Sequence, residues 1–270
     1  MKGNKFVGLI LAGLVLAGGV FAGGSRQSSG GLTIKPGVLS IGMEIGYPPM
    51  EYQDENGNVV GFDVQMARAI AAKLGLEVEF IDTAWDGIFA GVDTGKYDCI
   101  MSAVTITEER LAKNNFTKPY IGNAQALVLL KGSSIKARRP EDLNGLGVAY
   151  QAETTSDIYM AQLQQSQGLQ FTPYEYDKVI NCFDELKLGR VDAIVCDSLV
   201  AFDYIAPADS PFEIVWQGQA DEKFGICLKK GNDALTAAID KALDELFADG
   251  TMLKISQEIF KMDMVSAARK

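Results

Sequence analysis

The 270-residue sequence contains no histidine. A Ser-His-Asp triad needs an imidazole as its general base, and the usual protein zinc sites include histidine nitrogens among their ligands. The absence of histidine therefore excludes both the triad and these zinc sites.

Cysteine is also scarce, and its four copies are spread singly along the chain. Cys99, Cys182, Cys196 and Cys227 lack the paired spacing of structural metal sites, so we expect no metal centre. No other cofactor is expected either. Cys99, Cys196 and Cys227 lie in apolar, strand-like runs, which favours small buried thiols. A disulfide, for example between Cys182 and Cys196, stays open because sequence alone cannot pair cysteines.

Basic residues are also fewer than acidic ones, with 25 lysine and arginine residues against 35 aspartate and glutamate residues. Without the apolar N-terminal segment, which carries Lys2 and Lys5, 23 basic residues remain and the net charge is near −12. Such a charge argues against nucleic acid or an anionic membrane surface as a partner. It is compatible with a cationic or zwitterionic ligand.

The N-terminal segment has the layout of an export signal. A basic start precedes the apolar residues 6–22, and small residues suit cleavage after Ala22. We therefore expect a signal peptide at residues 1–22, a flexible spacer at 23–31 and a periplasmic or extracellular location. The alternative is an uncleaved anchor helix, whereas a lipid anchor finds no support because no cysteine follows the apolar run.

Beyond the spacer, strand and helix patterns alternate. Residues 38–45 and 97–104 are apolar runs typical of buried strands. Residues 62–74 carry apolar side chains at helical spacing before the helix-stopping Gly75, and a short helix is expected at 85–96. The alternation predicts an α/β fold with largely parallel strands.

A second set of strand and helix patterns begins near residue 125. Strands are expected at residues 125–133 and 191–198, and helices at 156–167 and 178–189, which gives this part a core of its own. Two helical segments close the chain. We interpret the pattern as two α/β lobes with a C-terminal part that returns to the first lobe; the alternative is one doubly wound domain.

Four segments stand out by their residues and their order: GFDVQMARAIA (61–71), YDCIMSAVTITEER (97–110), VDAIVCD (191–197) and GTMLKISQEIF (250–260). They resemble the signature, the ligand-binding segment, its second-lobe counterpart and the closing helix of the extracellular solute-binding proteins for polar amino acids, which serve ABC importers. The similarity extends over residues 39–262, nearly all of the mature chain.

The resemblance implies a type II periplasmic-binding-protein-like fold, in which two α/β lobes are joined by two crossover strands at a hinge. The crossovers would lie near residues 122–127 and 217–224. The first lobe would comprise residues 32–123 plus 221–270, and the second lobe residues 124–220. A monomer would close on a free L-amino acid and deliver it to an ABC importer permease.

Arg110 is the first residue that the resemblance assigns to a ligand. Helix starts favour acidic residues, so on the residues alone Arg110 would be a surface partner of Asp98 or of the acids near Glu109. In the family it would hold the α-carboxylate through two parallel N–H···O bonds. Thr105 would add a hydroxyl and a backbone N–H, and the Ala103 carbonyl would accept from the ammonium.

The second lobe would contribute the rest of the head-group site. Thr154 and Thr155 precede a helix expected from about Ser156, whose N-terminus would favour the carboxylate; either threonine could instead be an N-cap. Asp197, at the end of a strand pattern, would hold the ammonium. Its alternative role is to cap the helix that follows.

Four residues would face the side chain of the ligand. Tyr47 and Trp85 match the family's aromatic walls, although aromatic residues are usually core residues. Glu44 stands where relatives often carry aspartate, and Gln151 is neutral where some relatives carry lysine. These groups fit glutamine, arginine, lysine or histidine, whereas Glu44 would repel an acidic ligand.

Two positions depart from the family pattern. Glu153 replaces the usual glycine in QAETT and would favour a cationic ligand if its side chain pointed into the cleft. Gln65 replaces an acid within a helix, where we expect no contact with the site.

The resemblance favours a transport protein without enzymatic activity, and two alternatives stay open. The same fold carries a periplasmic cyclohexadienyl dehydratase, for which Glu153 or Glu44 would be the candidate general acid. A ligand-binding sensor for a chemoreceptor would have the same sequence features.

Overall fold

The computed structural model describes residues 31–269. The predicted signal segment, residues 1–22, lies outside these residues, as does nearly all of the predicted spacer, residues 23–31. Between residues 31 and 269, no helix combines the length and the apolar character needed to cross a membrane.

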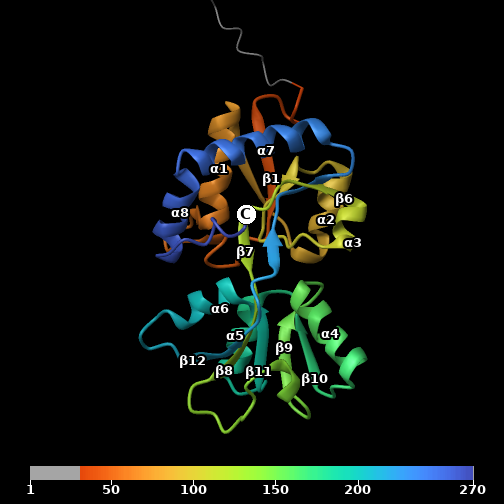
Figure 1. The fold of residues 1–270 in the computed structure, drawn as a ribbon, viewed down its shortest axis with the longest axis vertical. Helices are drawn as coiled ribbons and strands as arrows, with labels where there is room; N and C mark the ends of the chain where they lie inside the picture. Colours follow the sequence, from red (N-terminus) through yellow and green to blue (C-terminus); the bar gives the residue numbers. More distant parts are fainter. Residues whose placement is uncertain (1–30, 270) are drawn as a thin grey trace, which may run out of the picture.

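Two lobes, each built around a five-stranded sheet, make up the molecule (Figure 1). In the first lobe the strand order is β4-β1-β5-β14-β6, and only β14 runs against its neighbours. A two-stranded sheet of β2 and β3 lies beside it. The strands are β1 (Val38–Met43), β2 (Tyr52–Gln53), β3 (Val59–Val60), β4 (Glu77–Asp82), β5 (Cys99–Ile100), β6 (Asn114–Phe116) and β14 (Cys227–Lys229).

The second lobe repeats this plan with the strand order β10-β9-β11-β8-β12. Here β8 is the strand that runs against its neighbours, while β9, β10 and β11 are parallel. The strands are β8 (Gln125–Leu130), β9 (Gly147–Gln151), β10 (Thr172–Tyr176), β11 (Ala193–Asp197) and β12 (Phe212–Gln217).

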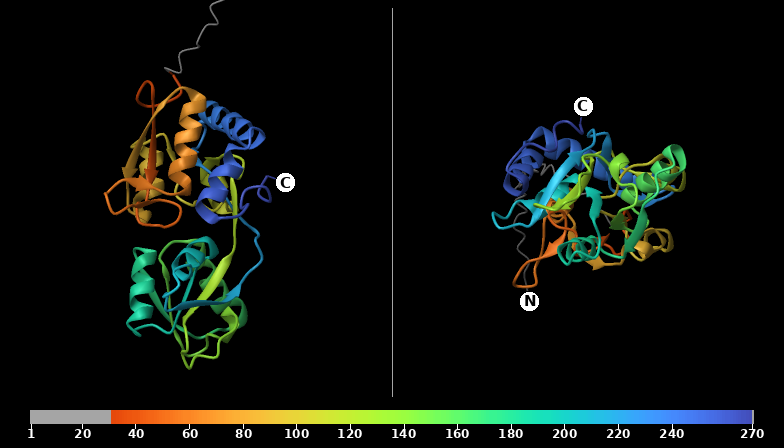
Figure 2. Two further views of the ribbon diagram at one scale, coloured as in Figure 1. Left: turned by 90° about the vertical axis from the view of Figure 1, so that its left-hand side faces the viewer. Right: turned by 90° about the horizontal axis from the view of Figure 1, so that it is seen from below.

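Two crossover strands, β7 (Ile121–Asn123) and β13 (Glu222–Phe224), connect the lobes and pair with each other in antiparallel fashion. Figures 1 and 2 show both connections on the same side of the molecule. In each sheet, the strand that runs against its neighbours is the one that the chain enters from a crossover. The strand β8 continues from β7, and β14 continues from β13. The predicted two-lobed fold is confirmed, and the residue limits of the lobes stay a prediction.

Helices cover both faces of each sheet, so each core is a sheet between helical layers. In the first lobe α1, α7 and α8 pack on one face and α2 on the other; in the second lobe α5 and α6 oppose α4. The helices are α1 (Phe62–Leu74), α2 (Trp85–Thr94), α3 (Glu108–Lys113), α4 (Thr155–Gln167), α5 (Val179–Lys187), α6 (Ser198–Ile205), α7 (Asp233–Ala248) and α8 (Thr251–Phe260), with a 3₁₀ turn at Pro140–Asp142.

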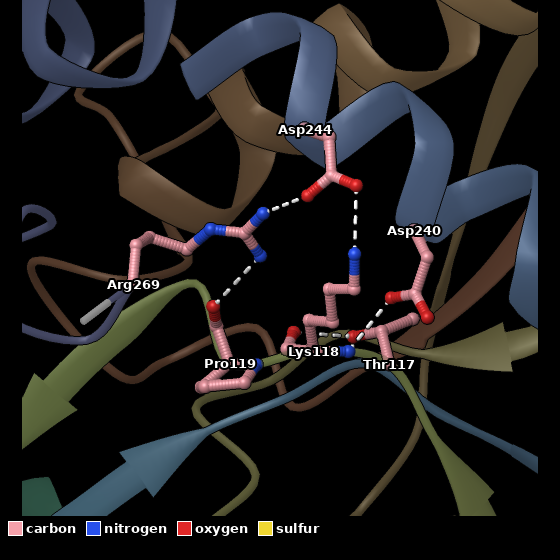
Figure 3. A network of polar contacts seen from close by, with 6 residues as sticks. All are labelled: Thr117, Lys118, Pro119, Asp240, Asp244 and Arg269. Carbon is pink, nitrogen blue, oxygen red and sulfur yellow. Dashed lines mark hydrogen bonds and ion pairs between the residues drawn. The ribbon is translucent and has the colours of Figure 1, made fainter. Parts of the chain in front are cut away.

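The C-terminal segment is fastened beside the first crossover (Figure 3). Arg269 donates to Pro119 O at 3.3 Å and forms an ion pair with Asp244 of α7. Lys118 Nζ donates to the carboxylate of Asp244 at 2.7 Å. The backbone N–H of Lys118 donates to Asp240 at 2.7 Å. These contacts tie α7 and the chain end to the residues that lead into β7.

The sequence patterns missed three short strands and overestimated one. The strands β2, β3 and β6 were not expected, whereas β7 overlaps the crossover predicted near residues 122–127, and of residues 97–104 only Cys99–Ile100 is a strand. Ala103, three residues after β5, has a positive φ of 48°, which does not fit a strand. All four cysteines lie buried as free thiols, so the pairing left open between Cys182 and Cys196 does not form.

Two glycines make room for one tyrosine in the core of the first lobe. A Cβ on Gly42 of β1 would lie 2.4 Å from the ring of Tyr97, and a Cβ on Gly91 of α2 would lie 2.1 Å from its hydroxyl. Tyr97 donates to Ile88 O at 2.5 Å, which fixes the ring in this slot.

Alanine at Gly91 should therefore destabilise the fold, while alanine at Gly87 of the same helix should not. Nothing lies within 4 Å of a Cβ at Gly87, so Gly87→Ala gains helix propensity and stabilises by roughly 0.5–1 kcal/mol. Gly91→Ala overpacks the core and costs about 1–3 kcal/mol. Urea unfolding of both variants measures the difference, and equal stabilities would contradict this packing.

Candidate functional site

A cavity lies between the lobes, and eleven residues line it. All ten residues that the resemblance assigned to a ligand are among them, so the structure brings the whole predicted set together. The lining residues are Glu44, Tyr47, Trp85, Ser102, Ala103, Thr105 and Arg110 from the first lobe and Gln151, Thr154, Thr155 and Asp197 from the second.

Strand ends bring these residues together. Glu44 follows β1, Ala103 follows β5 by three residues, Gln151 is the last residue of β9 and Asp197 the last of β11. The carboxyl ends of parallel strands are where open α/β sheets bind ligands. In this molecule the two sheets turn these ends toward each other across the cavity.

Arg110 is the only lysine or arginine on the cavity wall among the described residues. Its Nη1 donates to Thr105 O at 3.0 Å, and its guanidinium lies over the rings of Trp85 and Phe89, 5.4 and 5.1 Å from their centres. Burial lowers the pKa of Arg110, although a guanidinium stays charged. These contacts hold the charged group at the cavity without neutralising it.

The surface ion pair considered for Arg110 does not form. Asp98 instead accepts hydrogen bonds from the backbone N–H groups of Ile34 and Ser40, and Glu109 pairs with Lys113 at 2.8 Å. The planar donor group of Arg110 is therefore available to a bidentate anion such as a carboxylate.

The N-terminus of α4 faces Arg110 from the second lobe. Thr154 occupies the N-cap position, but its hydroxyl donates to Gln151 O at 2.7 Å, so it does not cap the helix. Thr155 Oγ1 lies 3.5 Å from Thr105 Oγ1 of the first lobe. An uncapped helix N-terminus attracts anions through its free N–H groups and its dipole.

Asp197 lies at the N-cap position of α6 without a side-chain cap bond. Its two oxygens accept from Tyr47 O–H at 2.6 Å and from Asn123 Nδ2 at 2.7 Å. Burial, followed by the nearby charge of Glu222, raises the pKa of Asp197 to about 7. Capping of the next helix, the alternative role, is therefore not what this side chain does.

Glu44 and Gln151 meet across the cavity, with Gln151 Nε2 donating to Glu44 Oε2 at 2.7 Å. Burial raises the pKa of Glu44 to about 7, against the opposing effect of this hydrogen bond. Gln151 Oε1 is buried without a hydrogen-bond partner among the described residues. This end of the cavity thus offers an acceptor and a carboxylate to a donor group.

The two aromatic residues belong to the core and also lie on the cavity wall, and their contact with a ligand stays a prediction. Tyr47 and Trp85 are 9% and 8% exposed, pack into hydrophobic clusters and also line the cavity. Trp85 Nε1 donates to Glu153 O in the other lobe at 3.1 Å. The Glu153 side chain is exposed and does not line the cavity, so it adds no charge to the wall, and neither does Gln65 line it.

Several supporting residues were not anticipated. Ser102 lines the cavity, and Glu222 of the second crossover accepts from Asn123 of the first crossover and from Gln125 at the start of β8, both at 2.8 Å. Asn123 in turn holds Asp197, so the hinge is bonded to the site. A partial signal existed, because Ser102 precedes Ala103 in the segment YDCIMSAV.

Family comparison gives the class of the protein. The bacterial extracellular solute-binding proteins, family 3, match residues 39–262 of the chain. The L-cystine-binding protein TcyJ of Escherichia coli (strain K12) is 33% identical over 229 residues, which cover 84% of each protein. The chain belongs to this family of extracellular solute-binding proteins, and the resemblance noted in its sequence is confirmed.

Solved structures share the fold. An ancestral arginine-binding protein bound to arginine has a TM-score of 0.78 at 39% identity, covering 83% of this chain and 98% of that chain. The TM-score is also 0.78 for an ancestral arginine-binding protein bound to glutamine. The ancestral amino acid-binding protein AncCDT-1, a precursor of cyclohexadienyl dehydratase, has a TM-score of 0.74 at 35% identity, covering 83% and 95%.

Substitution of Asp197 by asparagine should stabilise the protein without ligand at alkaline pH. The folded state raises the Asp197 pKa from 3.8 to about 7, so the folded state binds more protons than the unfolded state between these values and loses stability as pH rises. Asp197→Asn removes this loss and keeps an acceptor for Asn123.

Thermal unfolding at about pH 8 and about pH 4 tests the sign of this effect. We expect Asp197→Asn to raise the midpoint at the higher pH by at least about 2–4 °C, the shift that 1 kcal/mol produces in a chain of this size. At the lower pH the midpoints should nearly coincide. A variant that is less stable at the higher pH would show that the carboxylate supports the fold.

Proposed function

We propose that this protein captures a free basic or polar L-amino acid in the cavity between its lobes and delivers it to an ABC importer. The observation that carries the proposal is the placement of Arg110 and Asp197, which bring opposite charges to one cavity from opposite lobes. An α-amino acid carries the complementary pair of charges on one carbon atom.

The carboxylate of the ligand would lie between Arg110 and the N-terminus of α4. Thr105 and Thr155, whose hydroxyls are 3.5 Å apart, flank this position from the two lobes. The ammonium would lie between Asp197 and the Ala103 carbonyl. Each charge-assisted hydrogen bond contributes about 1.5–3 kcal/mol net, so a few of them suffice for micromolar binding.

The side chain of the ligand would extend toward Glu44 and Gln151. A carboxylate and an amide oxygen accept hydrogen bonds, and Trp85 and Tyr47 supply aromatic walls for an extended or planar group. Arginine and glutamine fit this pocket, as do lysine and histidine. The arginine-binding and glutamine-bound structures that share this fold support the choice.

Closure of the lobes would follow from contacts that only the closed arrangement offers. The carboxylate site and the ammonium site each combine groups from both lobes, so a bound amino acid favours the closed state by its differential affinity. Glu222, Asn123 and Gln125 connect this closure to the crossovers.

The transport role sets the expected location and partners. We infer an exported monomer with an N-terminal signal, which meets its permease at the membrane and carries no cofactor. The family membership supports an extracellular binding protein rather than an enzyme.

A second candidate function is a lyase on the same fold. Two observations favour it: the similarity to AncCDT-1, and a cavity carboxyl, Glu44, whose raised pKa of about 7 would suit a general acid. Incubation with prephenate and arogenate distinguishes the two functions. Formation of an aromatic product would establish the enzyme, and no turnover together with tight amino-acid binding would establish the transport protein.

A thermal-shift screen against the twenty amino acids, repeated with Arg110→Lys, tests the proposal. A ligand that binds only the folded state raises the unfolding midpoint, and we expect the largest rise for arginine or another member of the predicted group. Arg110→Lys replaces the bidentate donor by a point charge and should weaken binding by about 10- to 150-fold, the equivalent of one charge-assisted bond.

The exposed Arg190, which pairs with Glu185 on the surface, provides the matched control. Arg190→Lys should bind like the wild type, and both variants should keep the wild-type midpoint without ligand. A large loss of ligand-free stability in Arg110→Lys with unchanged affinity would give Arg110 a structural role instead.

Affinity for a basic amino acid should rise with pH from about 5 to about 8. The pKa values of Glu44 and Asp197 are both about 7, and each must be ionised to hold a cation. Each group then contributes up to about tenfold per pH unit below its pKa. Calorimetric titration of wild type and Glu44→Gln separates the two, because the variant should keep only the Asp197 part of the slope.

A further inference from the structure

Two fully buried carboxyl groups, Glu51 and Asp63, lie behind the cavity wall without lining it. Asp63 N–H donates to Met50 O at 2.9 Å, so the residue before Glu51 contacts the first turn of α1. The backbones approach so closely that a Cβ on Gly61 would come within 2.2 Å of Met50 O. This contact brings together the two backbone segments that carry the carboxyl groups, and the charge of Asp63 acts on Glu51.

Glu51 holds Ser102 through one oxygen. Ser102 Oγ accepts from Glu44 N–H at 3.0 Å, so its own proton points to Glu51 Oε1, 2.5 Å away. Glu51 Oε1 is therefore an acceptor. Through Ser102 it fixes the backbone of Glu44, which lines the cavity.

Asp63 holds Ala103 in the same way. Ala103 N–H and Tyr120 O–H both donate to Asp63 Oδ2 at 2.9 Å, so this oxygen is also an acceptor. Ala103 has a φ of 48°, a left-handed conformation that is unfavourable for a residue with a side chain. The bond to Asp63 stabilises the turn that directs Ala103 into the cavity wall.

The other two oxygens, Glu51 Oε2 and Asp63 Oδ1, are buried and have no hydrogen-bond partner within residues 31–269. Neither carboxyl group has an ion pair in this range, and the titratable groups around them are Glu44, Asp197 and Tyr120. Burial raises the pKa of Asp63 to about 7, and burial together with the charge of Asp63 raises that of Glu51 well above its ordinary value.

We propose that Glu51 and Asp63 share one proton between Glu51 Oε2 and Asp63 Oδ1, and that this acid pair positions Ser102 and Ala103 in the cavity wall. The donor directions leave these two oxygens as the place for the proton. One proton satisfies both of them and leaves a single negative charge, whereas two adjacent buried carboxylates would repel each other. The positioning role rests on the proposed function; the proton does not.

Infrared spectroscopy of the full-length protein detects the proton through the carbonyl stretch of a protonated carboxyl group. At about pH 8.5, above the pKa values near 7 of Glu44 and Asp197, the shared proton should still give this band. Glu51→Gln and Asp63→Asn each replace the shared proton by an amide N–H that donates to the remaining carboxylate. Either substitution alone should therefore remove the band, and the exposed Glu55→Gln should retain it.

Three results would overturn the proposal. If the wild-type protein lacks the band, both groups are ionised. This measurement uses the wild-type protein alone and does not depend on whether a variant folds. A band that survives Asp63→Asn belongs to Glu51 alone, and one that survives Glu51→Gln belongs to Asp63 alone.

Ligand affinity tests the positioning role separately. Asp63→Asn keeps an acceptor for Ala103 N–H and should bind the amino acid found in the thermal-shift screen within about tenfold of wild type, whereas Asp63→Leu should bind it at least about tenfold more weakly than Asp63→Asn. Equal affinities of the two variants would remove the positioning role. Absence of any amino-acid ligand for wild type would instead contradict the proposed function and leave the infrared result standing.

Discussion

Opposite charges held apart across one cavity are the constraint on which the rest of the structure depends. Arg110 approaches from the first lobe and Asp197 from the second, and neither forms an ion pair within residues 31–269. Burial opposes the charged form of both groups. Three hydrogen bonds to these two side chains hold the charged groups in place, as recognition of a zwitterion requires.

The architecture explains how these charges come to face each other. Each lobe directs the carboxyl ends of its parallel strands toward the cleft, and the strand that enters from the crossover is the one that runs in the opposite direction. Glu222, Asn123 and Asp197 then form a continuous set of hydrogen bonds from the hinge to the site. The hinge and the cavity are thus linked through a few short hydrogen bonds.

Behind the first-lobe wall of the cavity, buried polar groups hold the backbone of that wall in position. Ser102 and Ala103 leave strand conformation immediately after β5, and Glu51 and Asp63 accept the hydrogen bonds that their turn provides. Burying carboxyl groups without a neighbouring cation costs folding free energy. We therefore expect such a pair where it holds the backbone in a precise shape. The wall of an amino-acid site is such a place.

Much of the fold could be predicted from the sequence because its signals are local. Apolar spacing and Gly75 located α1, and the alternation of strands and helices indicated an α/β fold. The short strand β6 was missed because its pairing partner, β14, lies more than a hundred residues away in sequence.

For the site, the sequence alone did not distinguish Arg110 from a surface residue or Asp197 from a helix cap; the family resemblance did. The structure brings all ten expected residues to one cavity, and their contact with a ligand stays a prediction. The bonds of Glu51, Asp63 and Glu222 could not be anticipated, because they join residues that are distant in sequence and carry no periodic pattern.

The most direct measurement is a thermodynamic cycle between Arg110 and the ligand carboxylate. Calorimetric affinities of wild type and Arg110→Lys are compared for the preferred amino acid and for its decarboxylated amine. If Arg110 binds the carboxylate, the substitution weakens binding of the amino acid by about 10- to 150-fold and leaves binding of the amine unchanged. An equal loss for both ligands would contradict the account, because Arg110 would then act without contact to the carboxylate.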